Sequence, residues 1–521
     1  MSTSDVENAH ALARLAHDRI RYLPDLTVTR PVFRTYDGEK WVDSDQYTVR
    51  RMIDELSELY EIQATLAFQK AKQAKGDAAV EYENEGKRLI KASRRLLNTS
   101  GRSALMVELR TVESIVASAD DFDTDPLVIN CRNGLLNLKT MQLEAHHPDH
   151  LVTRSTSVEY HPIQSLTGRG PRSGPAGPDE TTGLGNNDMA SPYCASACPS
   201  RTCKCSIRWE SKYSAPSACP NWISFLQKMI PDPNVRRYLQ KLAGYFLSGL
   251  TTDQSLYLLL GTGSNGKSTF VETIADILGD YSEHISIETI LDKGGSPHEL
   301  AQLPGSRLVT SSEVPQNNRL NEALIKSITG GEEIRARALY QNSFTFLPSF
   351  KLLVSLNTLP RVTDVSEGMW RRLKPIDWPV SLSKEERNPR FREDVLKPEY
   401  EAVFAWMVDG WQLFRAEGLN PPGGVIDTLD AYREDSDPSG DWFRDSITVT
   451  SNPADRVPVS DVYTHYSEYC DAKNVRSKLS KTNLTQYLRR QGIESQKSGS
   501  TRYYTNLKIS KNDGGTLGFT S

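Results

Sequence analysis

The stretch GTGSNGKST occupies residues 261–269 and decides how the surrounding chain is interpreted. It contains Gly261, four further residues, and then Gly266, Lys267 and Ser268, which fits the phosphate-binding pattern G-x-x-x-x-G-K-[ST]. In such a loop the lysine contacts the β- and γ-phosphates of a nucleotide and the serine hydroxyl ligates Mg²⁺. The motif is short enough to occur by chance, so the neighbouring segments must support it.

The segments on either side of the loop predict a strand and a helix. SLYLLL, residues 255–260, is an apolar run typical of a buried central strand. After Ser268 apolar residues recur at helical spacing until Gly279. A helix that begins at the loop directs its N-terminus at the phosphates. We therefore expect ATP and Mg²⁺ as cofactors, bound by Gly261, Gly263, Asn265, Gly266, Lys267, Ser268 and Thr269.

Two later apolar segments predict strands that end in polar residues. RLVTSSEV, residues 307–314, delivers Glu313, and FKLLVSLN, residues 350–357, ends on Asn357. Ligands bind at the carboxyl ends of parallel strands, so we expect Glu313 and Asn357 to lie near the loop. Glu313 would then lie near Mg²⁺, with Ser268, and orient the attacking water. A small-molecule kinase with the same loop is an alternative, but it leaves Asn357 unexplained.

Composition sets the limits for the whole chain. Its 521 residues, 25% charged and 38% hydrophobic, suggest a soluble globular protein of roughly two to four domains. The net charge of −4 requires any nucleic-acid surface to be local. Apolar runs fall far short of the ~20 residues that cross a membrane, and the first residues lack a secretion signal. We expect the cytoplasm of a bacterial host and no membrane partner.

The pattern changes along the chain predict six segments. Apolar spacing around Leu56, Leu59, Ile62, Leu66 and Phe68 indicates helices in the first segment, and short strands joined by Asn-Gly follow near its end. The expected segments are a mainly helical domain (1–163), a flexible Gly/Pro/Cys-rich insert (164–213), the ATPase core (214–380), a helical extension (381–455), a basic domain (456–510) and a tail (511–521).

Cysteines gather in and after the insert. The spacing of these five does not form two C-x-x-C pairs, which favours reduced thiols over a zinc site but leaves zinc open. They are Cys194, Cys198, Cys203, Cys205 and Cys219.

The C-terminal segment is strongly basic. Residues 473–508 hold nine lysines and arginines and one acid, Glu494. The sequence there predicts two helices followed by a β-wing, which is a winged-helix pattern. Its second helix offers residues that reach phosphates and base edges in duplex DNA, Lys481, Arg489 and Arg490 among them. A solvated basic face is the alternative.

An ordered set of motifs resembles a known family. GTGSNGKST, RLVTSSEVPQNNRLNEALIKSITGGEEIRARALY, FKLLVSLNTLP and GMWRRLKPIDW together resemble the superfamily 3 helicases, and more closely the phage and plasmid primase–helicases related to the poxvirus primase–helicase. The resemblance covers residues 221–380 and extends upstream through residues 134–162. It implies an AAA+-like α/β P-loop ATPase core, a helical N-terminal domain and a C-terminal winged helix.

The resemblance also implies residue roles and partners. Arg371 or Arg372, with Arg372 favoured, matches the arginine inserted into a neighbouring subunit's site, which implies a homo-oligomer, in this family a hexameric ring. Residues 326–351 match a hairpin facing the channel for single-stranded DNA, with Lys326, Arg335, Arg337 and Lys351 as basic residues. Tyr340, Phe344 and Phe346 lie between them, and these aromatics stack on bases or belong to the core.

The resulting functional prediction is an ATP-dependent DNA helicase of phage, plasmid or mobile-element replication. One alternative is a non-translocating ATPase that binds or melts an origin. The other is a primase–helicase with a cryptic primase site. Because the N-terminal region offers no convincing pair of catalytic acids, a separate primase or polymerase is an expected partner.

Overall fold

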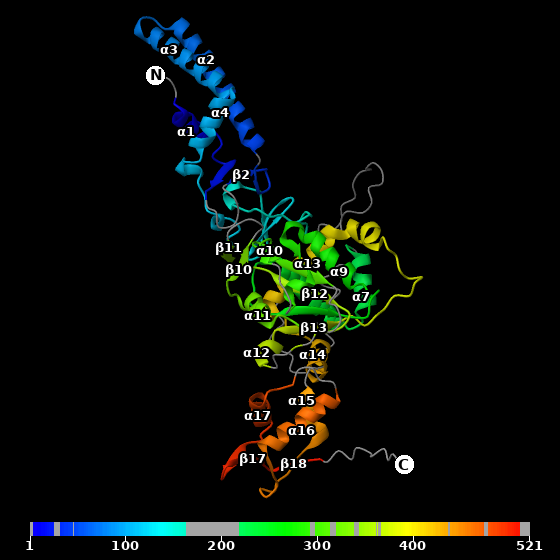
Figure 1. Cartoon of the computed structure of the whole chain (residues 1–521). Coiled ribbons are helices and arrows are strands. Elements are labelled where there is room, and N and C mark those ends of the chain that lie inside the picture. Colours follow the sequence, from blue (N-terminus) through cyan, green and yellow to red (C-terminus); the bar gives the residue numbers. More distant parts are fainter. Residues whose placement is uncertain are drawn as a thin grey trace, which may run out of the picture.

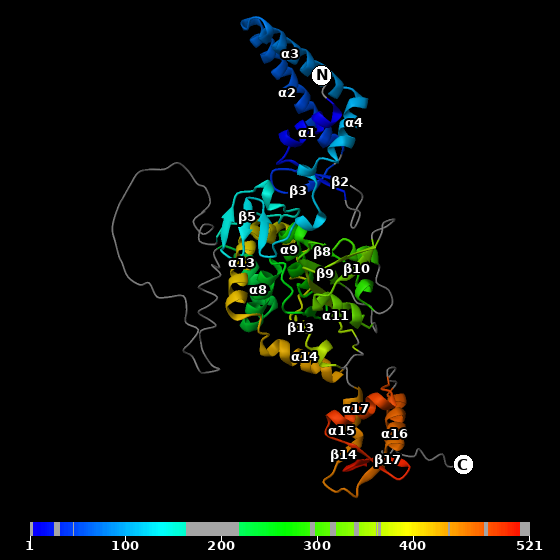
Figure 2. The ribbon, with the colours of Figure 1, turned by 90° about the vertical axis from the view of Figure 1, so that its left-hand side faces the viewer.

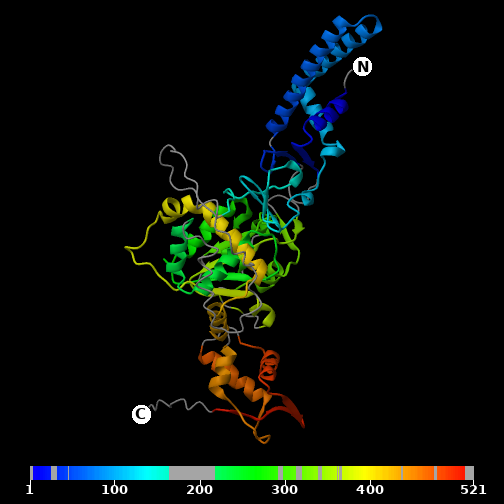
Figure 3. The same ribbon diagram turned by 180° about the vertical axis from the view of Figure 1, so that it is seen from behind.

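The computed structural model describes residues 4–24, 32–44, 46–162, 218–291, 297–312, 319–337, 343–360, 362, 366–435, 438–473 and 478–510. Its centre is a five-stranded sheet with helices on both faces (Figure 1). A long helical hairpin extends from one end of this centre, and a smaller unit of helices and strands lies at the opposite end (Figure 3). The insert, the tail, Glu313, Tyr340 and four of the five clustered cysteines lie outside the described residues.

The central sheet is parallel throughout, with the strand order β13-β7-β12-β9-β8. Alternate side chains of β7 enter two different cores: Tyr257 and Leu259 face one, and Leu256 and Leu258 face the other. Burial on both faces confirms the strand predicted from SLYLLL. The strands are β7 (Leu256–Leu260), β8 (Ser282–His284), β9 (Leu308–Ser312), β12 (Lys351–Leu356) and β13 (Leu373–Asp377).

Helices cover both faces of the sheet. The core that contains Tyr257 and Leu259 also contains residues of α7 (Pro220–Met229), α8 (Pro233–Phe246), α9 (Lys267–Leu278) and α13 (Tyr400–Glu417). The core on the other face contains residues of α10 (Pro297–Leu300), α11 (Glu322–Gly330), β10 (Ile334–Arg337), β11 (Ser343–Phe346), α12 (Glu367–Trp370) and α14 (Gly423–Asp435). β10 and β11 form a separate antiparallel hairpin.

The N-terminal region is mainly helical, as expected, and also contains a small sheet. Its elements are α1 (Asp5–Leu15), β1 (Ile20–Leu23), β2 (Val32–Tyr36), β3 (Trp41–Asp43), α2 (Gln46–Gln73), α3 (Asp77–Leu96) and α4 (Thr99–Leu109). The predicted helix is present as α2, but its apolar residues do not all face the core: Ile62 and Leu66 are 59% and 51% exposed, while Tyr60 and Ala64 are buried. The far half of α2 extends beyond the core and packs on α3 (Figure 1).

A second small sheet joins this region to the centre. It consists of β4 (Val128–Cys131), β5 (Gly134–Asn137) and β6 (Gln142–Glu144), and the predicted Asn-Gly turn at Asn133–Gly134 joins its first two strands. The sheet lies beside α13 (Figure 2), where the indole nitrogen of Trp411 donates to the carbonyl of Leu138 at 2.7 Å. Cys219, at the start of α7, is buried in the same core and so belongs to packing rather than to a surface metal site.

The C-terminal unit has its own core, which begins earlier than the sequence predicts. Trp442 and Ile447 belong to it together with Tyr466 and Leu488, so a boundary at residue 456 would divide this core. The elements are α15 (Pro438–Ser446), β14 (Ile447–Val449), β15 (Arg456–Pro458), α16 (Val459–Ala472), α17 (Lys481–Arg490), β16 (Ser495–Ser498), β17 (Thr501–Thr505) and β18 (Leu507–Ile509). In the second half of the unit, α16, α17 and the paired strands β16 and β17 follow one another in the predicted order.

Short helical turns complete the described chain. A π-helical turn spans Phe391–Leu396, and 3₁₀ turns span Glu113–Ile115, Ala119–Asp121, Pro148–His150, Gly279–Tyr281, Ile287–Ile290 and Lys397–Glu399. None of the helices within the described ranges is both long and apolar enough to traverse a bilayer.

Candidate nucleotide-binding site

The phosphate-binding motif forms a tight turn between β7 and α9. Gly263, Ser264 and Gly266 all have positive φ, and Gly266 directly precedes the helix in the left-handed conformation. At Gly266 a β-carbon would also lie 2.7 Å from the Phe225 ring, and at Gly261 it would lie 2.1 Å from the Asn265 amide nitrogen. Gly266 is therefore required by its backbone conformation and by close packing, and Gly261 by close packing.

Lys267 lies inside this loop. It is 5% exposed, and its ammonium donates to the carbonyl of Gly261 at 2.5 Å and to Oδ1 of Asn265 at 3.1 Å. Burial lowers the pKa of Lys267, and the charge of Asp377 opposes that shift. Ser268 is exposed and Thr269 partly exposed at the first turn of α9, where free backbone N–H groups favour an anion.

Asn265 serves the loop itself. Its side chain is 3% exposed, and its amide nitrogen donates to the carbonyl of Trp378 at 3.3 Å. The chain that follows β13 makes two further bonds to the loop: Ser381 Oγ donates to the carbonyl of Gly263, and Leu382 N donates to the carbonyl of Ser264. Residues 378–382 therefore fix the shape of the phosphate loop from outside.

The strand register brings the predicted polar ends to one edge of the sheet. Leu260 pairs with Leu356, and Gly261 N donates to the carbonyl of Leu356, so Asn357 follows directly beside the loop. Ser355 pairs with Ser312, the last described residue before Glu313. β12 lies between β7 and β9, so Asn357 is on the strand adjacent to the loop and β9 delivers its end one strand further away.

Asp377 is a member of this edge that the sequence motifs do not reveal. It ends β13 opposite Leu260, and its charge acts on Lys267. The sequence does carry a signal for Asp377, because β13, like β9 and β12, leads into a polar residue at its carboxyl end.

Arg371 and Arg372 lie at the opposite edge. They precede Leu373, which pairs with Leu256 at the start of β7, so about 16 Å of strand separates them from the loop at ~3.3 Å per residue. Arg371 is exposed. Arg372 is partly buried and donates to Thr329 Oγ1 at 3.0 Å and to the carbonyl of Gly368; burial, reinforced by Arg371, lowers its pKa. Neither arginine can complete the site of its own chain.

The predicted DNA-contact residues fall into different environments. Arg335 and Arg337 are exposed on one face of the β10–β11 hairpin, and Lys326 is partly buried on α11. Phe344 is buried on the opposite face of the hairpin with Ile334, so this aromatic belongs to the core. Lys481, Arg489 and Arg490 are all exposed on α17.

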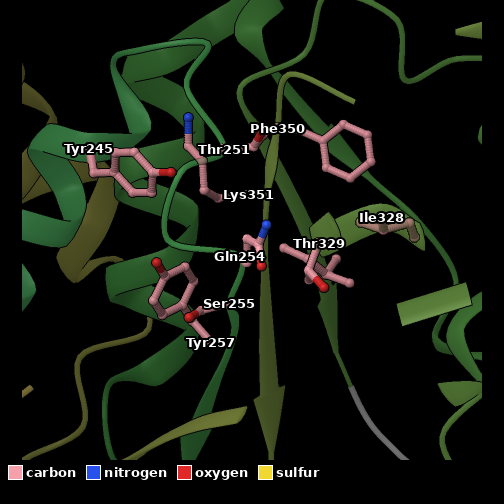
Figure 4. Close-up of a pocket in the computed structure, with 10 residues that line it drawn as sticks. Tyr245, Thr251, Gln254, Ser255, Tyr257, Ile328, Thr329, Phe350 and Lys351 are labelled. Carbon is pink, nitrogen blue, oxygen red and sulfur yellow. The ribbon is translucent and has the colours of Figure 1, made fainter. Parts of the chain in front are cut away.

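The prediction that Lys351 contacts DNA is wrong. Lys351 is 4% exposed, its ammonium donates to the carbonyl of Ser248, and it lies 4.7 Å from the ring centroid of Tyr245 (Figure 4). Ser248 follows the C-terminal end of α8, where carbonyl groups favour a cation. Burial, reinforced by the charge of Arg307, holds the pKa of Lys351 well below its ordinary value.

One group of side chains within the described ranges could hold a metal ion by its ligand types. Glu159, His161 and Glu401 place their ligand atoms within 4.8 Å of one another. His161 already contacts Glu159 at 2.9 Å, an arrangement that an ordinary ion pair also explains. None of the three belongs to the strand ends around the phosphate loop.

The fold and the site define the class first: an α/β protein with a parallel sheet, a phosphate-binding sequence at the carboxyl end of a central strand, and a helical N-terminal region. Residues 9–231 match the family described as D5 N terminal like, residues 259–372 match a family of unknown function (DUF5906), and residues 434–512 match the family described as poxvirus D5 protein-like. Both ends of the chain are therefore similar to poxvirus D5-type proteins, which supports a place in a poxvirus D5-like primase–helicase family.

The similar curated proteins come from large DNA viruses. "Putative helicase L207/L206" of Acanthamoeba polyphaga mimivirus is 23% identical over 88% of this chain and 45% of that protein. "Putative helicase 022R" of Frog virus 3 is 25% identical over 48% of this chain and 28% of that protein. "Putative primase C962R" of African swine fever virus is 23% identical, also over 48% and 28%. The chain spans less than half the length of these relatives.

A solved structure aligns with part of the chain. It is the A-form apo structure of the NrS-1 C-terminal region, at 13% identity over 56% of this chain and 75% of that one. The TM-score is 0.39, a likeness too loose to support an inference.

Proposed function

We propose that the protein is an ATP-dependent DNA helicase that acts in the replication of a virus, plasmid or other mobile element. The observation that carries this proposal is the edge of the sheet where the phosphate loop, Asn357 and the end of β9 lie on three neighbouring strands. The names of the viral relatives, helicase and primase, support a role in DNA replication.

In this proposal each residue of the edge has one task in hydrolysis. Lys267 leaves Gly261 and Asn265 to contact the β- and γ-phosphates, and Ser268 ligates Mg²⁺. Glu313 orients the attacking water, and Asn357 contacts the γ-phosphate. The transition state spreads negative charge over the transferred group, so positioning and positive charge supply most of the catalysis.

The positive charge from outside the chain comes from a neighbouring subunit. An arginine at the far edge of the sheet reaches a nucleotide only in the next copy of the chain, which favours a closed head-to-tail ring, with six subunits as the expected number. The resemblance favours Arg372 for this role. We assign it to Arg371, because Arg371 is exposed and makes one long hydrogen bond, to Gln254 at 3.5 Å, whereas Arg372 is partly buried and bonded to Thr329 and Gly368.

DNA contact is assigned to two surfaces. Arg335 and Arg337 on the β10–β11 hairpin face single-stranded DNA in the ring, where phosphate contacts do not require a base sequence. The C-terminal unit acts as a winged helix whose α17 contacts duplex DNA through Lys481, Arg489 and Arg490. Their exposure supports both assignments.

The test is strand separation on forked DNA by the wild type and by Lys267→Ala, with ATPase activity measured in parallel. We expect unwinding that requires ATP and is lost in the variant. DNA-dependent ATPase activity without unwinding would instead indicate a non-translocating ATPase that melts or marks an origin. Absence of any ATPase activity in the wild type would overturn the proposal.

A further inference from the structure

Arg372 and Thr329 form a hydrogen bond that joins two functional elements. Arg372 Nε donates to Thr329 Oγ1 at 3.0 Å, and the Thr329 hydroxyl donates in turn to the carbonyl of Ile325 at 2.7 Å. Thr329 is buried, so water does not readily replace the guanidinium if this bond breaks. The contact is therefore a defined one, between a charged donor and a hydroxyl that is itself held in place.

The two ends of this bond lead to different surfaces. Thr329 is the second-last residue of α11, which ends at Gly330, and the β10–β11 hairpin begins at Ile334. On the other side, the backbone carbonyl of Arg372 accepts from Leu256 N at 2.7 Å, which fixes it to the start of β7. A displacement that moves α11 together with the hairpin relative to the sheet would therefore act on the Arg372–Thr329 contact.

Arg371 is held at the same place. Gln254 lies just before β7 with a φ of +51°, a conformation that non-glycine residues seldom adopt, and its side-chain oxygen is 3.5 Å from Nη2 of Arg371. Gln254 and Thr329 line the same small pocket at the amino-terminal edge of the sheet (Figure 4). The partners of the two consecutive arginines thus line one pocket.

We propose that Arg372 is a positioning residue that couples the β10–β11 hairpin to Arg371. DNA binding displaces the hairpin and α11, the Arg372–Thr329 bond transmits this displacement to the start of β13, and Arg371 is brought into the neighbouring subunit's nucleotide site. The inference rests on the proposed helicase function and adds the contact through which DNA stimulates hydrolysis.

The experiment compares ATP hydrolysis by the full chain with and without single-stranded DNA in three variants. Thr329→Val removes the hydroxyl and keeps the shape, Thr329→Ser keeps the hydroxyl, and Thr428→Val is the control. Thr428 makes the same kind of hydroxyl bond to the carbonyl four residues earlier, on α14, which packs on β13, but it has no bond to an arginine in the described structure.

We expect Thr329→Val to lower the stimulation by DNA about tenfold, the factor typical of a lost charge-assisted hydrogen bond, with DNA-free hydrolysis and DNA affinity within about twofold of wild type. Thr329→Ser and Thr428→Val should keep the stimulation. Full stimulation in Thr329→Val would overturn the inference while leaving the proposed function intact. A wild type that DNA does not stimulate would instead contradict the proposed function.

A second pair of variants guards against a folding defect in Thr329→Val. Arg372→Lys keeps the charge but lacks the Nε donor, so it should lose the same part of the stimulation. The double variant with Thr329→Val should be no worse than either single variant, because both remove one interaction. Additive losses would show that the two residues act independently and would overturn the inference.

Discussion

At the scale of single residues, Lys267 combines burial with the catalytic task that we propose for it. Lys267→Ala should abolish ATP hydrolysis, because the ammonium that neutralises the phosphates is gone. The fold should persist, since the two lost hydrogen bonds contribute about 1–3 kcal/mol against a typical stability of about 5–15 kcal/mol. Turnover by malachite-green assay and melting by circular dichroism check both parts. Unchanged turnover would remove Lys267 from the site.

For Lys351 the structure predicts a role in stability and none in DNA binding, although the resemblance places this lysine in the hairpin segment of residues 326–351. Its folded-state pKa lies below the ordinary value, so the unfolded chain binds one more proton between the two values. Stability must therefore rise as the pH increases through that window. Lys351→Met should lose this part of the rise and should bind single-stranded DNA as the wild type does.

Melting temperatures are measured from about pH 7 to 10 for the wild type and for Lys351→Met. The difference between the two proteins isolates the contribution of Lys351 from that of other buried lysines such as Lys241. Arg335→Ala, on the exposed face of the hairpin, is the matched variant that should weaken DNA binding. Parallel melting curves, or weaker DNA binding by Lys351→Met, would contradict the assignment of Lys351 to the core.

At the scale of elements, α17 presents its charged face outward. Its apolar residues Leu484 and Leu488 are buried, which leaves Lys481, Arg489 and Arg490 to solvent. Replacing these three by glutamine should weaken duplex binding and reduce the salt slope by about two to three units, near 0.9 for each lost phosphate contact. ATPase activity without DNA should be retained, because the unit has its own core.

The matched control replaces three exposed basic residues elsewhere, Lys87, Arg390 and Lys397, by glutamine. An equal loss in both triple variants would indicate bulk charge rather than a defined surface. Substitution in the full chain is preferable to truncation at residue 456, which would separate β14 from its partner β18.

The comparison of sequence and structure shows which elements local patterns can predict. β7, the phosphate loop and α9 follow from residues within one short stretch, because strand burial and helix start are both local properties. The strand order is not local: that β12 lies between β7 and β9 depends on pairing across the chain. Lys351 was misassigned for the same reason, since residue type does not reveal which lysine lies beneath a helix end.

At the scale of the whole molecule, the two edges of one sheet would carry complementary halves of a site in the proposed ring. The phosphate loop and Asn357 are at the carboxyl edge, and Arg371 is at the amino edge beside Leu256. A surface that joins one edge of a subunit to the other edge of the next is heterologous, and such contacts generate rings when the rotation closes. The arrangement therefore accounts for a shared site without any symmetric interface.

This arrangement predicts complementation between two inactive variants. Arg371→Ala keeps its phosphate loop, and Lys267→Ala keeps its arginine, so a site between them is complete when the loop comes from the first and the arginine from the second. Each variant alone should be nearly inactive. In an equal mixture of subunits that exchange freely, about a quarter of the sites should be complete, and ATPase activity should recover to about that fraction at most.

The control mixes Lys267→Ala with Arg390→Ala, an exposed arginine paired with Asp394 on its own turn, which should simply dilute the active enzyme. No recovery in verified mixed oligomers would show that Arg371 does not act across the subunit boundary, whereas activity of Arg371→Ala alone would return the role to Arg372.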